Sequence, residues 1–217
     1  MRAITKSLEP ASLTTHRLTP HGNYDNYPQK DELREALVHE QRGLCCYCMT
    51  RITPGSSSMK IEHWRCQTRH ENLELAYRNL LGACLGGDGQ PAHLQHCDTR
   101  KGESDVKWNP AEPNHWIEQR IRFEPDGTIA SDDVEFDAQL NDVLGLNLQL
   151  LKNRRSSVLT GMLDWWKAEK ARLQGPVPRE RLERERARRA GNGTETFAPL
   201  EPLTVWWLDQ RLARYAT

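Results

Sequence analysis

Cysteines supply the first chemical signal in this sequence. All six lie between residues 45 and 97 of the 217-residue chain, and three of them fall within four positions. Cys45 and Cys48 form a C-x-x-C turn, which allows two thiolates to bind one tetrahedral Zn²⁺ at about 2.3 Å each. Cys84 and Cys97, on either side of a glycine-rich loop, are the candidates for the second pair. The pattern therefore predicts a structural zinc site.

Other assignments of the zinc ligands fit the same sequence. Cys46 can replace Cys45, and His93 or His96 can replace one thiolate. The cysteines can also be buried free thiols, which pack as small hydrophobic residues. Packing is the preferred interpretation for Cys66, which has no evident partner, but it does not explain three cysteines within four residues.

Polar residues with catalytic potential lie between the cysteine pairs and beside the last cysteine. They are Glu62, His63, Asn79, Asp98 and Lys101. Taken alone, each residue has an ordinary structural explanation: a histidine is often a hydrogen-bonded structural residue, and an asparagine or aspartate often caps a helix or a turn. The order in which these residues follow one another is more informative than any one of them.

That order resembles the HNH, or ββα-metal, endonucleases. Zinc-bearing members of this family carry C-x-x-C, then Asp or Glu followed by His, then N-L-x-x-x-C, then a C-N/H/D-x-x-K motif. This sequence departs from the compact members in the long insertion before Cys97 and in Asp98, where Asn or His is commoner. The four motifs match in order as Cys45/Cys48, Glu62-His63, Asn79-Leu80 with Cys84, and Cys97-Asp98 with Lys101.

The resemblance implies an α+β fold, in which a zinc-stapled ββα-metal (HNH) nuclease core carries a mainly helical C-terminal part. His63 would be the general base, and Asn79 would hydrogen-bond its imidazole and orient it. Glu62 and Asp98 would hold Mg²⁺ or Mn²⁺, hard cations that prefer oxygen ligands. Lys101 would contact a phosphate of the nucleic acid. The zinc would stabilise the fold and take no part in cleavage.

Further segments narrow the resemblance to the HNH subunits of the Septu and retron-associated anti-phage systems. Within that group, the chain would be a nuclease effector whose partner is an ABC/SMC-like ATPase and, in the retron case, a reverse transcriptase with its RNA–DNA hybrid. The chain itself carries no G-x-x-x-x-G-K-[ST] motif for ATP. The likeness extends to about residue 160 and rests on residues 1–6, 41–48, 61–63, 77–81, 96–101, 109–110 and 147–155.

Residues 1–110 are expected to form the nuclease domain with its zinc site. Four elements are expected there: an irregular N-terminal stretch with three prolines, a helix, a strand that carries the acid–histidine pair, and a loop after Asn79. They correspond to residues 1–29, 31–41, 59–63 and 82–91.

Residues 111–217 are expected to form a hairpin followed by helices that bind a partner. Pro125-Asp126-Gly127 is a turn signal, because proline presets φ and glycine allows positive φ. Apolar spacings of three, four and seven residues predict the helices. The arginine-rich helix is interpreted as solvated rather than phosphate-binding, and the tryptophan pairs 165/166 and 206/207 as core or interface anchors. The hairpin is expected over 121–130, and helices over 137–173, 179–190 and 203–215.

Composition limits the function classes. Lys plus Arg and Asp plus Glu number 30 each, so the formal net charge is zero, whereas a dedicated duplex-binding module is usually basic. Neither a long apolar run nor a signal-like N-terminal segment is present, which predicts a cytoplasmic protein without membrane contact. DNA is the preferred substrate. The alternatives are a nuclease that cuts RNA such as tRNA, and a zinc-stapled nucleic-acid-binding or adaptor module without turnover.

Overall fold

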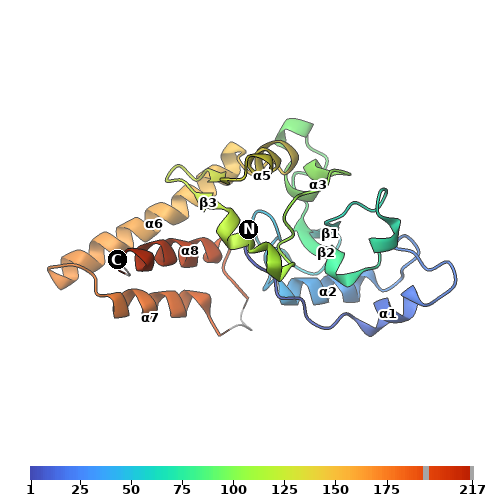
Figure 1. Ribbon diagram of the computed structural model, residues 1–217, viewed down its shortest axis with the longest axis horizontal. Coiled ribbons are helices and arrows are strands. Elements are labelled where there is room, and N and C mark those ends of the chain that lie inside the picture. The colour runs from blue at the N-terminus through green and yellow to red at the C-terminus, as the bar shows by residue number, and fades with distance from the viewer. Residues whose placement is uncertain (193–195, 216–217) are drawn as a thin grey trace.

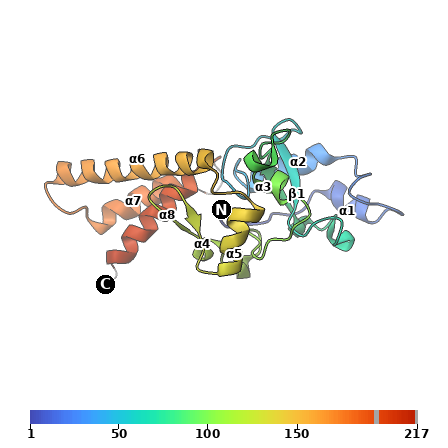
Figure 2. The same ribbon diagram turned by 90° about the horizontal axis from the view of Figure 1, so that it is seen from above.

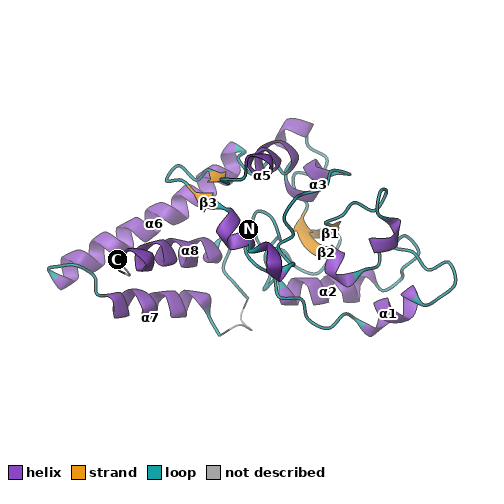
Figure 3. Cartoon of the chain, viewed as in Figure 1, coloured by secondary structure: helices purple, strands orange, loops and turns teal. Residues whose placement is uncertain are grey.

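The computed structural model describes residues 1–192 and 196–215 of the chain. Helices and two small antiparallel sheets make up this part, so the predicted mixture of helix and strand is confirmed (Figure 3). The molecule is elongated, with α1, α2 and the first sheet at one end and α6, α7 and α8 at the other (Figure 1). The elements are α1 Ala11–Arg17, α2 Lys30–Glu40, β1 Met59–His63, β2 Leu80–Cys84, α3 Cys97–Lys101, α4 Ile117–Arg120, β3 Arg122–Phe123, β4 Ile129–Ala130, α5 Val134–Ala138, α6 Gln149–Leu173, α7 Arg179–Ala190 and α8 Glu201–Leu212.

The first sheet carries much of the candidate site. β1 pairs with β2 in antiparallel register, with His63 opposite Leu80. The short helix α3 packs against β2, beside the sheet (Figure 2). The predicted strand over 59–63 is confirmed, but the expectation of a loop beginning at residue 82 is wrong, because residues 82–84 belong to β2.

The side chain of Gln41 explains how a glycine can lie inside β2. Gly82 N–H donates to Gln41 Oε1 at 2.6 Å, and Gln41 Nε2 donates to Gly82 O at 2.7 Å. The Gln41 amide thus pairs with both backbone groups of Gly82 on the edge of β2 that faces away from β1. A Cβ atom at residue 82 would lie 2.9 Å from Ile52, so close packing favours glycine there despite its low strand propensity.

The N-terminal segment is more regular than its prolines suggest. The sequence predicts an irregular stretch over 1–29, but residues 11–17 form α1. Pro10 lies at the N-cap, where the fixed φ of proline is tolerated and its missing N–H costs nothing, and Leu13 is fully buried beneath the helix. The helix predicted over 31–41 is confirmed as α2.

The buried apolar residues form two clusters. The larger cluster extends from Met1 to Leu208 and includes every cysteine except Cys66, as well as Leu203 of α8. The smaller cluster lies under α1 and α2 and reaches Ile61 and Leu80 of the two strands. The domain boundary at residue 110 stays a prediction, and the larger core is continuous across it.

The C-terminal elements follow the predicted pattern. The expected hairpin is confirmed by the pairing of β3 with β4. The helical prediction over 137–173 is confirmed as two helices, α5 and the 25-residue α6, separated by a π-helical turn over 139–143 and a short connection. α8 lies between α6 and α7 and contacts both (Figure 1). None of the helices in the described part of the chain combines the length and apolar character needed to cross a bilayer.

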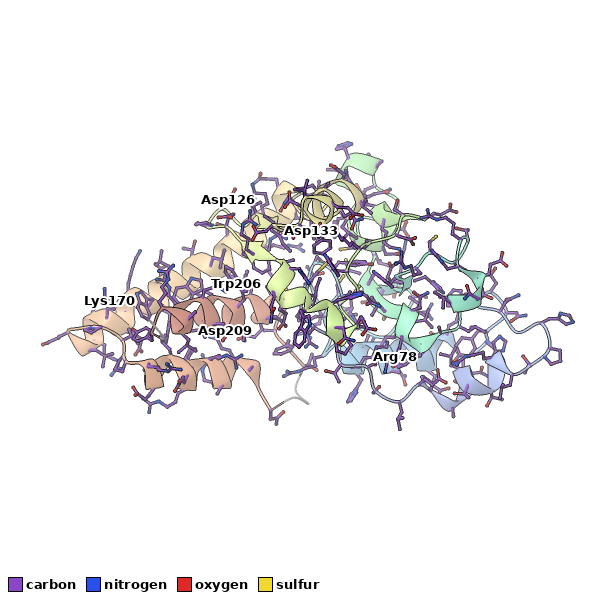
Figure 4. The ribbon with its side chains drawn as sticks, viewed as in Figure 1. Arg78, Asp126, Asp133, Lys170, Trp206 and Asp209 are labelled. Atoms are coloured by element: carbon purple, nitrogen blue, oxygen red, sulfur yellow. The ribbon has the colours of Figure 1, made fainter. Side chains whose placement is uncertain are left out.

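The charged helix α7 is held by ion pairs to its neighbours. Arg181 contacts Glu169 of α6 at 3.0 Å, and Arg186 pairs with Asp209 of α8. Figure 4 labels Asp209 together with Trp206 on α8. Because these arginines meet protein carboxylates, the structural interpretation of the helix is favoured over phosphate contact. The two tryptophan pairs of α6 and α8 pack on the larger core, as the sequence analysis expects of anchors: Trp165, Trp166, Trp206 and Trp207.

Candidate zinc centre and catalytic cleft

Three separate segments bring four cysteines together. Cys45 and Cys48 lie in one turn, Cys84 ends β2, and Cys97 begins α3. All four thiols are buried, and their sulfur atoms lie within 4.8 Å of one another. The four residues selected from the sequence are therefore the four that the fold assembles.

The spacing of the sulfur atoms fits a zinc ion. The Sγ atoms of Cys48 and Cys84 are 3.6 Å apart, and those of Cys45 and Cys97 are 3.9 Å apart. Four thiolates placed tetrahedrally at about 2.3 Å from Zn²⁺ lie about 3.8 Å from one another. Burial alone would raise the pKa of Cys45, but hydrogen bonds with the surrounding thiols outweigh it and hold the pKa well below its usual value, whereas the hydrogen bonds within the cluster together with burial raise the pKa of Cys84 and of Cys97. The cluster can therefore bind zinc with little rearrangement.

The alternative ligands lie outside this cluster. Cys46 is buried but is not a member of it, and His93 is exposed. His96 Nδ1 lies 3.1 Å from Cys97 Sγ, so it contacts a ligand sulfur rather than completing the cluster itself. The inserted loop between Cys84 and Cys97 is pinched at its base, where His96 N–H donates to Gly86 O at 2.8 Å. This closure explains how two cysteines separated by twelve residues meet.

A cleft of about 230 Å³ opens next to Asp98, the residue that follows Cys97 of the four-cysteine cluster. Glu62 and His63 of β1 and Asp98 of α3 all line it. Asp98 lies in the first turn of α3, and no side-chain hydrogen bond caps the start of that helix. The capping explanation for Asp98 is therefore not supported. The adjacent acid–histidine pair and the later aspartate share one concave site.

Glu62 is an unusual carboxylate because it is almost completely buried, with 1% exposure. Its Oε1 accepts a hydrogen bond from Tyr47 Oη at 2.7 Å. Its Oε2 is buried and has no hydrogen-bond partner among the described residues. Burial first, and then the neighbouring Asp98 carboxylate, raise the pKa of Glu62 well above its usual value. Tyr47 is a site residue that the sequence analysis did not identify, because nothing in the C-C-Y-C run shows what its ring faces.

Lys101 differs from its expected role. The sequence predicts contact with a phosphate, but the residue is buried, with 2% exposure. Its Nζ lies 2.9 Å from Glu62 Oε1 and donates to the backbone oxygen of His63 at 2.9 Å. The ammonium is therefore an internal counter-ion of Glu62, and its burial does not suit contact with nucleic acid.

His63 is held by two neighbours. Its Nε2 lies 3.0 Å from the backbone oxygen of Glu74, and its ring meets the ring of Tyr24 edge-on, with centroids 4.4 Å apart. Burial lowers the pKa of His63, because a charged imidazolium loses hydration there. The contacts of His63 with Glu74 O and with Tyr24 could not be predicted from the sequence, because neither a backbone acceptor nor a packing ring belongs to a recognisable motif.

Asn79 acts on the backbone rather than on the imidazole. Arg65 N–H donates to its Oδ1 at 2.8 Å, and its Nδ2 donates to Arg65 O and Leu73 O at 3.1 Å each. The direct hydrogen bond to His63 that the resemblance implies is therefore replaced by contacts that tie the backbone of Arg65 to that of Leu73. Asn79 remains next to the site, opposite Trp64 in the backbone pairing.

Comparison with known proteins places this geometry in context. No protein-family model matches the chain. A candidate HNH endonuclease of retron Ec83 from Escherichia coli is 26% identical over 125 residues, which cover 49% of this chain and 48% of the relative. The Septu protein PtuB from Bacillus thuringiensis is 30% identical over 81 residues, which cover 37% of this chain and 28% of the relative. The chain thus spans about half of the length of the first relative and less of the second.

A four-thiol centre beside an acid–histidine cleft is the arrangement expected of a zinc-bearing HNH protein. The name of the retron relative agrees with the HNH class. The chain is related to the candidate HNH endonuclease of retron Ec83 and to Septu protein PtuB, which confirms the resemblance carried by its motifs.

Proposed function

We propose that the chain is a metal-dependent HNH endonuclease that hydrolyses phosphodiester bonds of nucleic acid, with β1, β2 and α3 as its ββα-metal core. The observation that carries this proposal is the single cleft lined by Glu62, His63 and Asp98. A histidine and two carboxylates in one cleft match what the reaction needs: a base for water, and oxygen ligands for a cation that meets the phosphate.

His63 takes the proton from the attacking water in this mechanism. A backbone carbonyl oxygen only accepts hydrogen bonds, so the contact with Glu74 O requires that Nε2 carries the ring proton. In the neutral ring, Nδ1 then keeps the lone pair that can accept a proton. The lowered pKa favours this neutral form at physiological pH. Glu74 and Tyr24 fix the plane of the ring, which holds the base in one orientation.

Glu62 and Asp98 fit a hard divalent cation such as Mg²⁺ or Mn²⁺. Tyr47 and Lys101 hold Oε1 of Glu62, and the other oxygen is buried and finds no partner in the described part of the chain, as expected of a ligand atom. Asp98 supplies a second carboxylate in the same cleft. It adds a further oxygen ligand, and a cation would compensate the negative charge of Glu62 and Asp98. When bound there, the ion stabilises negative charge on the phosphate and on the leaving oxygen.

At the level of the system, the chain is proposed to be the effector of a cytoplasmic anti-phage complex. The names of the two relatives support this setting. Its partner would be an ABC/SMC-like ATPase and, where a retron is present, a reverse transcriptase with its RNA–DNA hybrid. The α6–α8 end lies away from the cleft and is the proposed docking part (Figure 1). DNA is the preferred substrate, because HNH sites most often cut DNA.

Cleavage assays with two histidine variants test the proposal. Supercoiled DNA and total RNA are incubated with the chain, alone and with the ATPase partner, in Mg²⁺ or Mn²⁺, and the ends of the products are mapped. His63→Ala is expected to lower the cleavage rate at least about a hundred-fold with unchanged zinc content. The matched control is His39→Ala, at an exposed position of α2. Wild-type rates in His63→Ala would contradict the assignment.

One observation favours a second function. Lys101 already neutralises Glu62 from inside the protein, which is the arrangement expected of a binding or adaptor module that has no need of a cation. In that case the chain would retain binding to nucleic acid but show no turnover in any divalent metal, with or without partner. Cleavage of tRNA rather than DNA in the same assay would instead change only the substrate.

A further inference from the structure

A second set of metal-ligating side chains lies outside the four-cysteine cluster. Cys66, His70 and Asp105 each offer one ligand atom, and the three atoms lie within 4.8 Å of one another. Cys66 is buried and the other two are half-buried. Cys66 also lines the cleft that contains His63, although none of the three residues has a role in the mechanism above. The interpretation of Cys66 as an isolated packing residue does not account for this neighbourhood.

The local backbone presets the three side chains. His70 N–H donates to Cys66 O at 3.1 Å, which closes one helical turn and puts side chains four residues apart on the same side. Asp105 follows α3 and is fixed from the same turn, because Cys66 N–H donates to its Oδ1 at 3.2 Å. Its Oδ2 lies 3.0 Å from His70 Nε2. Two distant segments are thus joined around one small space.

Two arginines surround these groups and favour their anionic forms. Arg69 Nε donates to Cys66 Sγ at 3.2 Å, and Arg65 Nη1 lies 3.3 Å from Asp105 Oδ2. The side chain of Arg69 is 57% exposed, so it can move into solvent when a cation arrives. A thiolate is the form of cysteine that binds metal.

We propose that Cys66, His70 and Asp105 form a second metal site for a zinc-class divalent ion, beside the catalytic cleft. One thiolate, one imidazole and one carboxylate are a donor set that selects Zn²⁺ over Mg²⁺. Three protein ligands leave the fourth position for water or a substrate oxygen, as in open zinc sites. The site is independent of the four-cysteine centre, because the two sets share no residue.

Cobalt titration of the full chain carrying one equivalent of Zn²⁺ tests the proposal, because the four-thiolate centre takes that equivalent ahead of a site with a single thiolate. Zinc keeps the four-cysteine centre occupied, so added Co²⁺ reports on other sites. A thiolate-to-cobalt charge-transfer band can arise at Cys66 but not at Glu62 and Asp98, which carry no sulfur. The wild-type chain is expected to develop this band and saturate at one equivalent. Its intensity is expected to be about a quarter of that of a four-thiolate cobalt site.

Three variants assign the band. Cys66→Ser is expected to remove it, and His70→Gln to weaken Co²⁺ binding at least about ten-fold. Cys46→Ser, which changes a buried cysteine outside both sets, should leave the titration unchanged. A wild-type chain without the band overturns the proposal whatever the variants do. So does a band of full intensity in Cys66→Ser, or undiminished affinity in His70→Gln.

Discussion

Lys101→Met is expected to destabilise the fold by about 3 kcal/mol. The side chains of Lys101 and Glu62 are each 1% exposed, and Nζ lies 2.9 Å from Oε1. Removing one partner of a buried ion pair costs about 3–5 kcal/mol, because the other charge stays buried without compensation. His63 O loses a donor as well. The lower end of the range is expected because Tyr47 still donates to Glu62, and because the raised pKa of Glu62 lets the carboxyl take up a proton once the ammonium is gone.

Urea unfolding of the zinc-loaded protein, followed by circular dichroism, measures this cost. The matched control is Lys167→Met, whose pair with Asp164 spans 3.7 Å at 66% and 65% exposure. That change is expected to stay within about 0.5 kcal/mol of wild type. The salt dependence of binding to any nucleic acid should be the same for Lys101→Met and wild type. Wild-type stability together with a shallower salt slope would refute the counter-ion argument and restore the phosphate contact.

Three further predictions concern metal, backbone and pH. Cys84→Ser is expected to lose bound zinc, measured by mass spectrometry, and about 10 °C in melting temperature, whereas Cys46→Ser should keep its zinc. Gly127→Ala should cost about 3 kcal/mol in urea unfolding, because its Cβ would lie 2.0 Å from a backbone oxygen of α6 at φ 86°; Gly161→Ala, in open space on α6, should gain about 0.5 kcal/mol, and equal effects would contradict this. Burial alone would raise the pKa of Glu185, but hydrogen bonds from two arginines of α7 lower it to about 2, below the unfolded value of 4.5. Its contribution, about 1 kcal/mol after solvent screening, is therefore full above pH 4.5 and is lost as pH falls toward 2. Glu185→Gln should lower stability at pH 7 but not near pH 2, and a constant difference would count against this reasoning.

The sequence predicts the four-cysteine cluster well. Two of its members lie in one short turn, and the other two are recognised from the order of the motifs along the chain. A C-x-x-C turn almost specifies its own shape, and two later cysteines completed the set. The C-x-x-C spacing favours Cys45 over Cys46, but it leaves Cys46 open as an alternative, because the direction in which each side chain leaves the turn depends on the fold. The strand over 59–63 is predictable from its residue types. The end of β2 is not, because Gly82 favours a loop and its place in the strand depends on the distant side chain of Gln41.

The detailed environment of the cleft could not be predicted, because burial is a property of the whole fold. A lysine three residues after an aspartate suggests a surface charge, yet Lys101 points inward to Glu62. The partner of the His63 imidazole is the backbone oxygen of Glu74, and any residue type could supply that atom. Asn79 illustrates the opposite case: the residue lies where the motif places it, but its amide contacts backbone groups.

The pinched loop between Cys84 and Cys97 has an evolutionary consequence. Its neck, the hydrogen bond between His96 and Gly86, separates an exposed tip at residues 88–94 from the sulfur cluster. The entropy of closing a loop grows slowly with length, by about 0.6 kcal/mol per doubling. Insertions and deletions at the tip are thus cheap, and lineages can diversify there while the metal-binding framework stays intact.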